Sequence, residues 1–310
     1  MEDMLPNSPD PHTLWLAAGR GLLDMCTDLL ERNHNVPGYI DYIDSFRETS
    51  TLVHALKNAH YDRFTGFSNP PETGKYLSVI KLLLAYGAKI ENDARPADAL
   101  YYAIEQGPSI EYMQVLLNSP QNINLDRKFR GRTPLMTALG MVGNSGRLAR
   151  EQMSRLLSHG ADVHVLDDQG NDILHQIGSD DSGVCNILAK FGADFNRKCR
   201  YGRTPLHFTI YTSTQNMQYG NFYANGFVKA MQVFLDHGTD VYARDDTGRT
   251  AIQLAEALLP PNDRGLELLQ SIDLMTTFAM GTHEKNGEEC LMKHLPKEVI
   301  RLILRPEHQQ

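Results

Sequence analysis

The chain has 310 residues, a length that would ordinarily suggest two globular domains. Hydrophobic residues make up 41% of it, as expected for a folded protein, and its formal net charge of −8 argues against nucleic acid as a general partner. No apolar run approaches the roughly 18 residues that span a bilayer, and residues 1–6 lack the basic and apolar regions of a signal peptide. We therefore expect a folded protein that neither inserts into a membrane nor binds nucleic acid.

The four cysteines are scattered along the chain without CxxC spacing. They are Cys26, Cys185, Cys199 and Cys290. Regular pairing would be typical of a metal site or of a disulfide framework. We therefore expect reduced thiols and a cytoplasmic location, either in the cell that makes the protein or in a host cell.

Taken in chain order, seven segments share one pattern, in which an apolar anchor on a first helix precedes an apolar pair on a second helix. The anchors are Leu14, Val53, Leu100, Leu135, Leu174, Leu206 and Ile252. The pairs are Leu29-Leu30, Leu83-Leu84, Leu116-Leu117, Leu156-Leu157, Ile187-Leu188, Phe234-Leu235 and Leu268-Leu269. Units four to six match the pattern best. Altered outer units are expected, because the ends of a stack must face water.

The pattern is clearest where Thr-Pro-Leu begins the first helix, at residues 133–135 and 204–206, each time after a turn glycine. Threonine caps free backbone N–H groups, and proline at the first helical position loses no hydrogen bond. The second helix ends in Gly-Ala-Asp or Gly-Thr-Asp, at residues 160–162 and 238–240, where glycine supplies the backbone freedom that a helix end needs. One such unit cannot bury its apolar face alone, so the units must stack.

This pattern resembles the ankyrin repeat, and the resemblance covers residues 12–272. It implies an all-α solenoid of about seven helix–turn–helix units with β-turn tips and a concave groove. It also implies a non-catalytic scaffold that binds another protein through the groove and the loops. Residues 1–11 would form an N-terminal extension, and residues 273–310 a C-terminal tail.

Two of the expected turns are basic, at residues 126–132 and 197–203, and an acidic turn at residues 167–170 separates them. Because successive turns of such a stack line up, we expect an edge that alternates in sign and suits a partner with acidic patches. The turn residues expected to bind a partner are Arg130, Arg132, Tyr201 and Arg203. The alternative is a set of solvated tips with no dedicated partner, since turn tips are usually charged.

Units two, four and six carry extra residues between their two helices, and such insertions project from one edge of a stack. In units two and six they hold aromatic residues on polar loops, which is typical of binding surfaces. The insertion residues expected to bind are Tyr61 and Phe64 in unit two, and Tyr219, Phe222 and Tyr223 in unit six, whose insertion also holds Tyr211. Residues 140–146 of unit four predict a plain flexible loop. The alternative is that these loops only pack on their own helices.

After about Asp273 the repeat pattern stops, and residues 295–304 predict an amphipathic helix. The sequence Leu-Pro-x-Glu-Val also resembles the first helix of an F-box, as carried at the C-termini of some viral and bacterial ankyrin proteins. The residues on this motif are Leu295, Pro296, Glu298, Val299 and Ile303. The resemblance implies docking on the Skp1 adaptor of a cullin ubiquitin ligase. The alternative is a helix that covers the last unit.

The histidines follow the repeat and do not form a catalytic pattern. His54, His175 and His207 occupy the first-helix position that hydrogen-bonds between units in the ankyrin family, and Trp15 takes this position in the first unit. We expect Asn196, in a turn that resembles one hydroxylated in ankyrin proteins, to tie down that turn. No HExxH, GxxxxGK[ST] or GxSxG motif is present. We therefore expect no catalytic site, metal or cofactor. An enzyme with a site on the insertion loops is the alternative, and perturbed titratable groups would reveal it.

Overall fold

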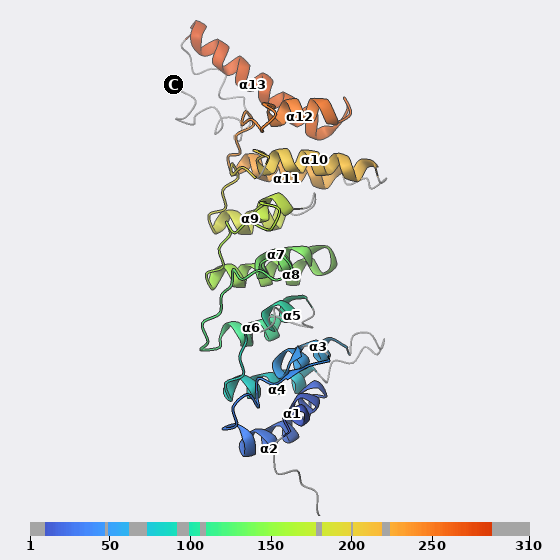
Figure 1. Cartoon of the computed structure of the whole chain (residues 1–310). Helices are drawn as coiled ribbons and strands as arrows, with labels where there is room; N and C mark the ends of the chain where they lie inside the picture. Colours follow the sequence, from blue (N-terminus) through green and yellow to red (C-terminus); the bar gives the residue numbers. More distant parts are fainter. Residues whose placement is uncertain are drawn as a thin grey trace, which may run out of the picture. The chain divides into compact units, whose positions relative to one another are not determined.

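In a computed structural model, the described residues form two compact units, Met1–Asp162 and Val163–Gln310. The described ranges are 10–46, 49–61, 73–91, 99–105, 110–177, 182–199, 201–218 and 224–286. Helices make up nearly all of the regular structure in both units (Figure 1). The two units are considered one at a time below.

The N-terminal unit consists of four helix pairs that pack in two layers. Its helices are α1 (Pro11–Gly19), α2 (Leu23–Asn33), α3 (Thr51–Tyr61), α4 (Thr73–Ala85), α5 (Ala99–Glu105), α6 (Ile110–Leu117), α7 (Pro134–Gly140) and α8 (Val142–Ser158). The first helices α1, α3, α5 and α7 pack on one another in sequence, and the second helices α2, α4, α6 and α8 do the same. Each second helix also packs on its own first helix, so a continuous apolar core runs between the two layers.

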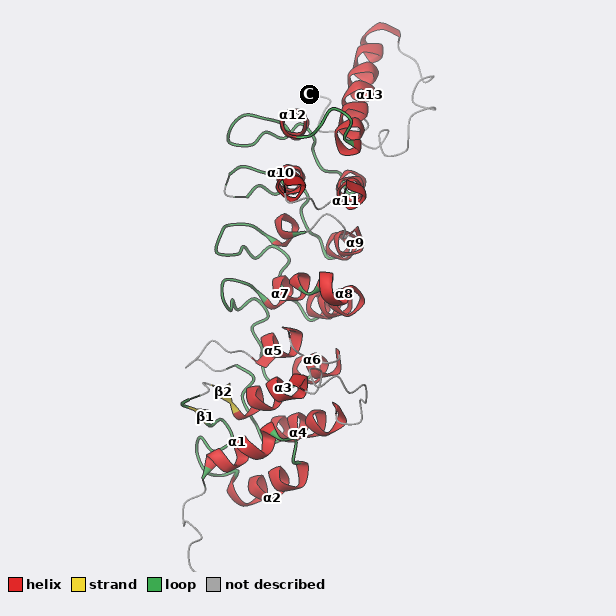
Figure 2. Cartoon of the chain, turned by 90° about the vertical axis from the view of Figure 1, so that its right-hand side faces the viewer, coloured by secondary structure: helices red, strands yellow, loops and turns green. Residues whose placement is uncertain are grey.

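The C-terminal unit has the same internal arrangement, with three pairs. Its elements are the 3₁₀ helix η1 (Ile173–Gln176), α9 (Ser182–Lys190), α10 (Pro205–Gln218), α11 (Ala224–Asp236), α12 (Ala251–Leu258) and α13 (Arg264–Asn286). The first helices η1, α10 and α12 form one column and α9, α11 and α13 form the other, with the turns projecting beyond the first-helix column (Figure 2). The described helices of the two units therefore make seven pairs, as the sequence pattern predicts.

One small β element departs from the helical pattern. Strands β1 (Ile43–Asp44) and β2 (Thr49–Ser50) pair antiparallel just before α3, with Ile43 opposite Ser50. Backbone pairing in the turn between two repeats gives N–H and C=O groups a partner without another helix.

The caps predicted from sequence are present at the helix starts. Thr133 accepts a hydrogen bond from the Met136 amide at the start of α7. Thr250 accepts one from the Gln253 amide and receives the Gln253 side chain on its own amide, which completes a capping box at α12. These bonds use N–H groups that the helix leaves unpaired.

The predicted anchors all lie in the core. The seven buried anchors are Leu14, Val53, Leu100, Leu135, Leu174, Leu206 and Ile252. At least one member of every predicted second-helix pair is buried too, namely Leu30, Leu83, Leu116, Leu156, Leu188, Phe234 and Leu269. The alignment of the seven units by sequence is therefore confirmed.

The prediction of a flexible loop at residues 140–146 is wrong. α7 ends at Gly140 and α8 begins at Val142, so the extra residues lengthen the second helix. Glycine within a helix costs about 1 kcal/mol relative to alanine, but the following residues, 147–153, are good helix formers. Burial of Ala149 and Met153 also ties this first part of α8 to the core.

The sixth pair shows the same effect. α10 continues to Gln218, so Tyr211 lies on a helix and not on a loop. α13 likewise runs as one helix through Asp273 to Asn286, across the position where the repeat pattern ends in the sequence. In both α10 and α13, residues beyond the regular repeat pattern therefore extend a helix.

We expect Leu188→Ala to destabilise the C-terminal unit by about 2–5 kcal/mol, because this side chain is fully buried on α9 and its removal leaves a cavity. Urea unfolding followed by circular dichroism measures the change. The matched control is Leu274→Ala, at a side chain that is 71% exposed, with an expected change within about 0.5 kcal/mol. Equal effects of the two changes would contradict the assignment of the core.

Candidate functional site

A ring N–H group joins the first helix of one repeat to the turn of the next. The Nε2 atom of His175, on η1, lies 3.0 Å from the carbonyl oxygen of Arg203. The Nε2 atom of His207, on α10, lies 3.1 Å from the carbonyl oxygen of Arg249. This confirms the predicted role of the histidine position for His175 and His207. Trp15, at the same position of the first repeat, donates from Nε1 to the Thr49 carbonyl at 3.1 Å.

The hydrogen bonds of His207 define its tautomer. The Thr204 hydroxyl donates a hydrogen bond to Nδ1 at 2.8 Å, while Nε2–H donates one to the Arg249 carbonyl. The ring is buried, and this burial lowers its pKa below the usual 6.5. The neutral ring therefore matches both partners.

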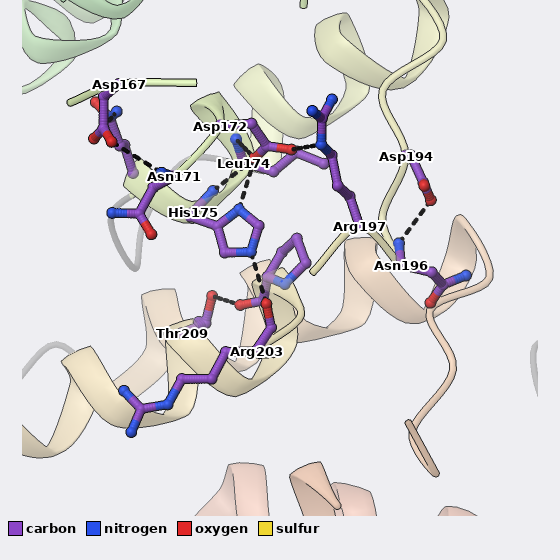
Figure 3. Close-up of polar contacts among 12 residues, drawn as sticks. Asp167, Asn171, Asp172, Leu174, His175, Asp194, Asn196, Arg197, Arg203 and Thr209 are labelled. Carbon is purple, nitrogen blue, oxygen red and sulfur yellow. Dashed lines mark hydrogen bonds and ion pairs between the residues drawn. The ribbon is translucent and has the colours of Figure 1, made fainter. Parts of the chain in front are cut away.

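In the fifth repeat an aspartate replaces this threonine. Asp172 Oδ1 lies 2.7 Å from His175 Nδ1 and caps η1 by accepting from the Leu174 amide at 3.0 Å (Figure 3). Arg197 reaches the second oxygen of Asp172 from the following turn at 3.9 Å. Since the Asp172 and His175 side chains are only 2% and 1% exposed, this pair is a buried polar link within the C-terminal unit.

That link fixes the turn that carries two of the predicted binding residues. The Arg203 carbonyl accepts from the Cys199 amide at 2.8 Å as well as facing His175 Nε2. Gly202 has φ +65°, and a Cβ atom there would collide with Asp246 of the next turn. Only glycine therefore suits this position, and the turn backbone is held on both sides.

Arg203 forms a cation–π cluster with two tyrosines. Its guanidinium carbon lies 5.5 Å from the centre of the Tyr201 ring and 4.7 Å from that of Tyr211. Tyr201 is 59% exposed and Tyr211 38% exposed, whereas Arg203 is half-buried. We call these three residues the Arg203 cluster. The turn supplies Tyr201 and Arg203, and α10 supplies Tyr211, which the sequence interpretation had placed on a loop.

The other two predicted turn residues lie in the N-terminal unit. Arg130 is exposed, has φ +53° and stacks on the Phe129 ring at 5.0 Å. With Gly131 at φ +78°, it forms the two central positions of a tight reverse turn that pairs Phe129 with Arg132. Arg132 is exposed too, and its guanidinium lies beside Gly140.

The remaining predicted site residues fall largely outside the described part of the chain. Tyr61 is the last residue of α3, and its side chain is not described. The insertion residues outside the described ranges are Phe64, Tyr219, Phe222 and Tyr223, and the tail residues outside them are Leu295, Pro296, Glu298, Val299 and Ile303. Their roles stay predictions.

Short polar side chains tie two of the turns to the helix end of the following repeat. Asp126 accepts from the Asp162 amide at 2.9 Å. Asn196 accepts from the Asp240 amide at 2.6 Å and donates to the Gly238 carbonyl at 3.1 Å, which confirms its predicted structural role. The sequence interpretation missed Asp126, although an apolar residue followed by Asp or Asn recurs at this register.

The described residues show few features of a catalytic or metal site. In the parts of the chain that the structure covers, no group of three His, Cys, Asp or Glu side chains could hold a metal ion. No helix among these residues is both long and apolar enough to cross a bilayer. What the described geometry offers is a half-buried cation beside two exposed aromatic rings, next to a fixed turn.

Comparison with known proteins agrees with this architecture. The ankyrin repeat family model matches residues 130–168, which hold the fourth helix pair and its turns. Residues 130–168 therefore hold an ankyrin repeat. A search of curated protein sequences gave no match.

Two solved structures extend the likeness over 83% of this chain. One is the ankyrin repeat domain of Bcl-3, described as a unique member of the IkappaB protein family, with 20% identity, a TM-score of 0.61 and 97% of that chain covered. The other is the human ASB11 ankyrin repeat domain, with 19% identity, a TM-score of 0.54 and 96% of that chain covered. At these identities the likeness concerns the fold.

We expect His207→Gln to flatten the pH dependence of stability. The folded pKa of His207 is lowered by burial, so the unfolded chain binds more protons below about pH 6.5. The free energy of unfolding should therefore rise as the pH increases through this region and fall on acidification. Urea unfolding at a series of pH values measures the slope. A slope as steep in the variant as in the wild-type protein would rule out this contribution.

Proposed function

We propose that this ankyrin stack is a non-catalytic scaffold that binds a partner protein, and that the Arg203 cluster is a principal contact. Ankyrin domains are in general protein-interaction modules, and this chain has the fold. The observation that carries the proposal is the exposed pair of tyrosines held against an arginine on a fixed turn.

The backbone of the cluster is ordered before any partner arrives. The Arg203 carbonyl is held by the Cys199 amide and faces His175, and the Tyr201 carbonyl accepts from the Asp246 amide at 3.1 Å. Binding loses less free energy to ordering when the contact residues are already in place. This turn therefore suits a specific contact better than a solvated, mobile tip.

The chemistry of the cluster is also that of a binding surface. Tyrosine and arginine dominate the free energy of protein interfaces, because they combine a large apolar area with directed hydrogen bonds. Arg130 and Arg132 on the turn of the N-terminal unit are proposed as a further contact, since Arg130 is likewise exposed and stacked on an aromatic ring.

The insertions complete the proposed surface. The role of the insertions is supported by their composition alone, because their aromatic residues lie among polar and flexible ones. The residues proposed are Tyr61, Phe64, Tyr219, Phe222 and Tyr223. The proposal includes no cofactor. It places the protein in the cytoplasm, because the cysteines lack paired spacing and Cys26, Cys185 and Cys199 are free thiols.

The double variant Tyr201→Ala/Arg203→Ala should recover much less of the partner protein than the wild type does. Affinity purification of the tagged full chain followed by quantitative mass spectrometry measures recovery, and we expect at least about a tenfold loss, as for interface hot spots. The matched control is Arg32→Ala/Phe46→Ala, which removes another exposed arginine and an aromatic side chain that is 92% exposed. Undiminished recovery by the first variant would refute a contact at this cluster.

A second candidate function is substrate recruitment to a Skp1–cullin ubiquitin ligase through the tail. The observation favouring it is the F-box-like sequence at residues 295–303. We expect the full chain, but not a version ending at Glu289, to recover the Skp1–cullin complex. The double variant Leu295→Ala/Ile303→Ala should lose it as well. Recovery of the same partners by both lengths, without a ligase, would leave the tail as a cap.

A further inference from the structure

We infer that the partner contributes an acidic peptide segment, and that one of its Asp or Glu carboxylates binds the edge of the Arg203 guanidinium beside the Tyr201 and Tyr211 rings. This inference rests on the proposed function, because it names the chemistry of the partner at the same site. It follows from the charges around the cluster and from the hydrogen bonds that those charges already make.

The turn at residues 194–203 is locally basic, although the whole chain is acidic. The described cations of this turn and of the next one, at residues 240–249, are Arg197, Lys198, Arg203, Arg244 and Arg249. The nearby acids are partly engaged. Asp172 is buried against His175, and Asp245 accepts from the Thr247 and Arg249 amides at 2.9 and 3.0 Å. Asp194 and Asp246 are the exposed acids of these two turns within the described ranges. Within residues 194–203 the described cations Arg197, Lys198 and Arg203 thus outnumber the single acid, Asp194, and this excess favours an anionic ligand.

Four of the five cations already have polar partners. Arg197 pairs with Asp172, and Lys198 Nζ donates to the Arg244 carbonyl at 2.8 Å. Arg244 donates to the Gly248 carbonyl at 2.7 Å. Arg249 Nε likewise donates to the Thr247 hydroxyl at 2.9 Å. These side chains are thus used to hold the turns.

Arg203 differs from the other four. Among the described residues its guanidinium makes no hydrogen bond or ion pair, and Nε is buried without a partner. The two aromatic rings lie beside the guanidinium without using its N–H groups in a hydrogen bond, so these donors stay available. A planar fork of N–H groups matches a carboxylate with two parallel hydrogen bonds. The tyrosine rings also restrict the side chain, so less entropy is lost on binding.

A short acidic segment fits this surface better than a nucleic acid. Binding along a nucleic acid backbone needs a long basic track that neutralises many phosphates. Here the basic residues gather on two neighbouring turns of a chain with a formal net charge of −8. One or two carboxylates can be matched at such a site without bringing a polyanion close to the rest of the protein.

The test uses the full chain and a fluorescein-labelled hexaglutamate peptide, with binding followed by fluorescence anisotropy at low and at physiological salt. We expect hexaglutamate to bind, to weaken as salt is added, and to bind Arg203→Ala about tenfold more weakly. Arg203→Lys keeps the charge but loses the planar fork, so it should not restore binding. Arg32→Ala, which removes an exposed arginine on α2, should bind as the wild type does.

Each remaining outcome decides against the inference. Absence of hexaglutamate binding, or equal binding by wild type and Arg203→Ala, would overturn it. Equal or tighter binding of labelled hexathymidylate with the same dependence on Arg203 would indicate a nucleic acid ligand instead. If partner recovery in the affinity purification still depends on Tyr201 and Arg203 while hexaglutamate fails, the scaffold function stands and only the acidic partner is excluded.

Discussion

The bond from a first-helix ring to the turn of the next repeat is the interaction on which the rest of this molecule depends. Helix packing alone fixes how neighbouring repeats stack, but it leaves the long turns with backbone groups that need partners. His175 and His207 supply these partners from within the core, and Trp15 does so in the first repeat. Because each ring belongs to a packed helix, its hydrogen bond ties the turn to the core.

The fifth and sixth repeats show how this arrangement creates a binding surface. Asp172 orients His175, His175 faces the Arg203 carbonyl, and the side chain of Arg203 then lies between the turn and α10. A buried, hydrogen-bonded network thus supports a cluster of two exposed tyrosines and a half-buried arginine. The scaffold contributes rigidity, and the exposed side chains contribute chemistry, which is the usual division in proteins that bind through loops.

Insertions altered the repeats in a way that local sequence signals did not indicate. Glycines at residues 140, 143 and 146 favour a loop by intrinsic preference. The helix nevertheless forms, because Ala149 and Met153 are buried when α8 continues through them. Packing against a neighbouring helix outweighs about 1 kcal/mol of unfavourable propensity for each glycine. The same reasoning applies to α10, whose extension carries Tyr211.

The sequence by itself determined the repeat. Its anchors, Thr-Pro helix starts and glycine turns are local signals, and each recurs often enough to be aligned without a structure. Only the tertiary structure decided which exposed residues meet. Tyr211 joins Tyr201 and Arg203 because α10 continues past its expected end and lies beside the turn. Likewise, Asp126 ties its turn to a helix end 36 residues away. Contacts of this kind depend on the relative placement of whole elements, which no local pattern of residues encodes.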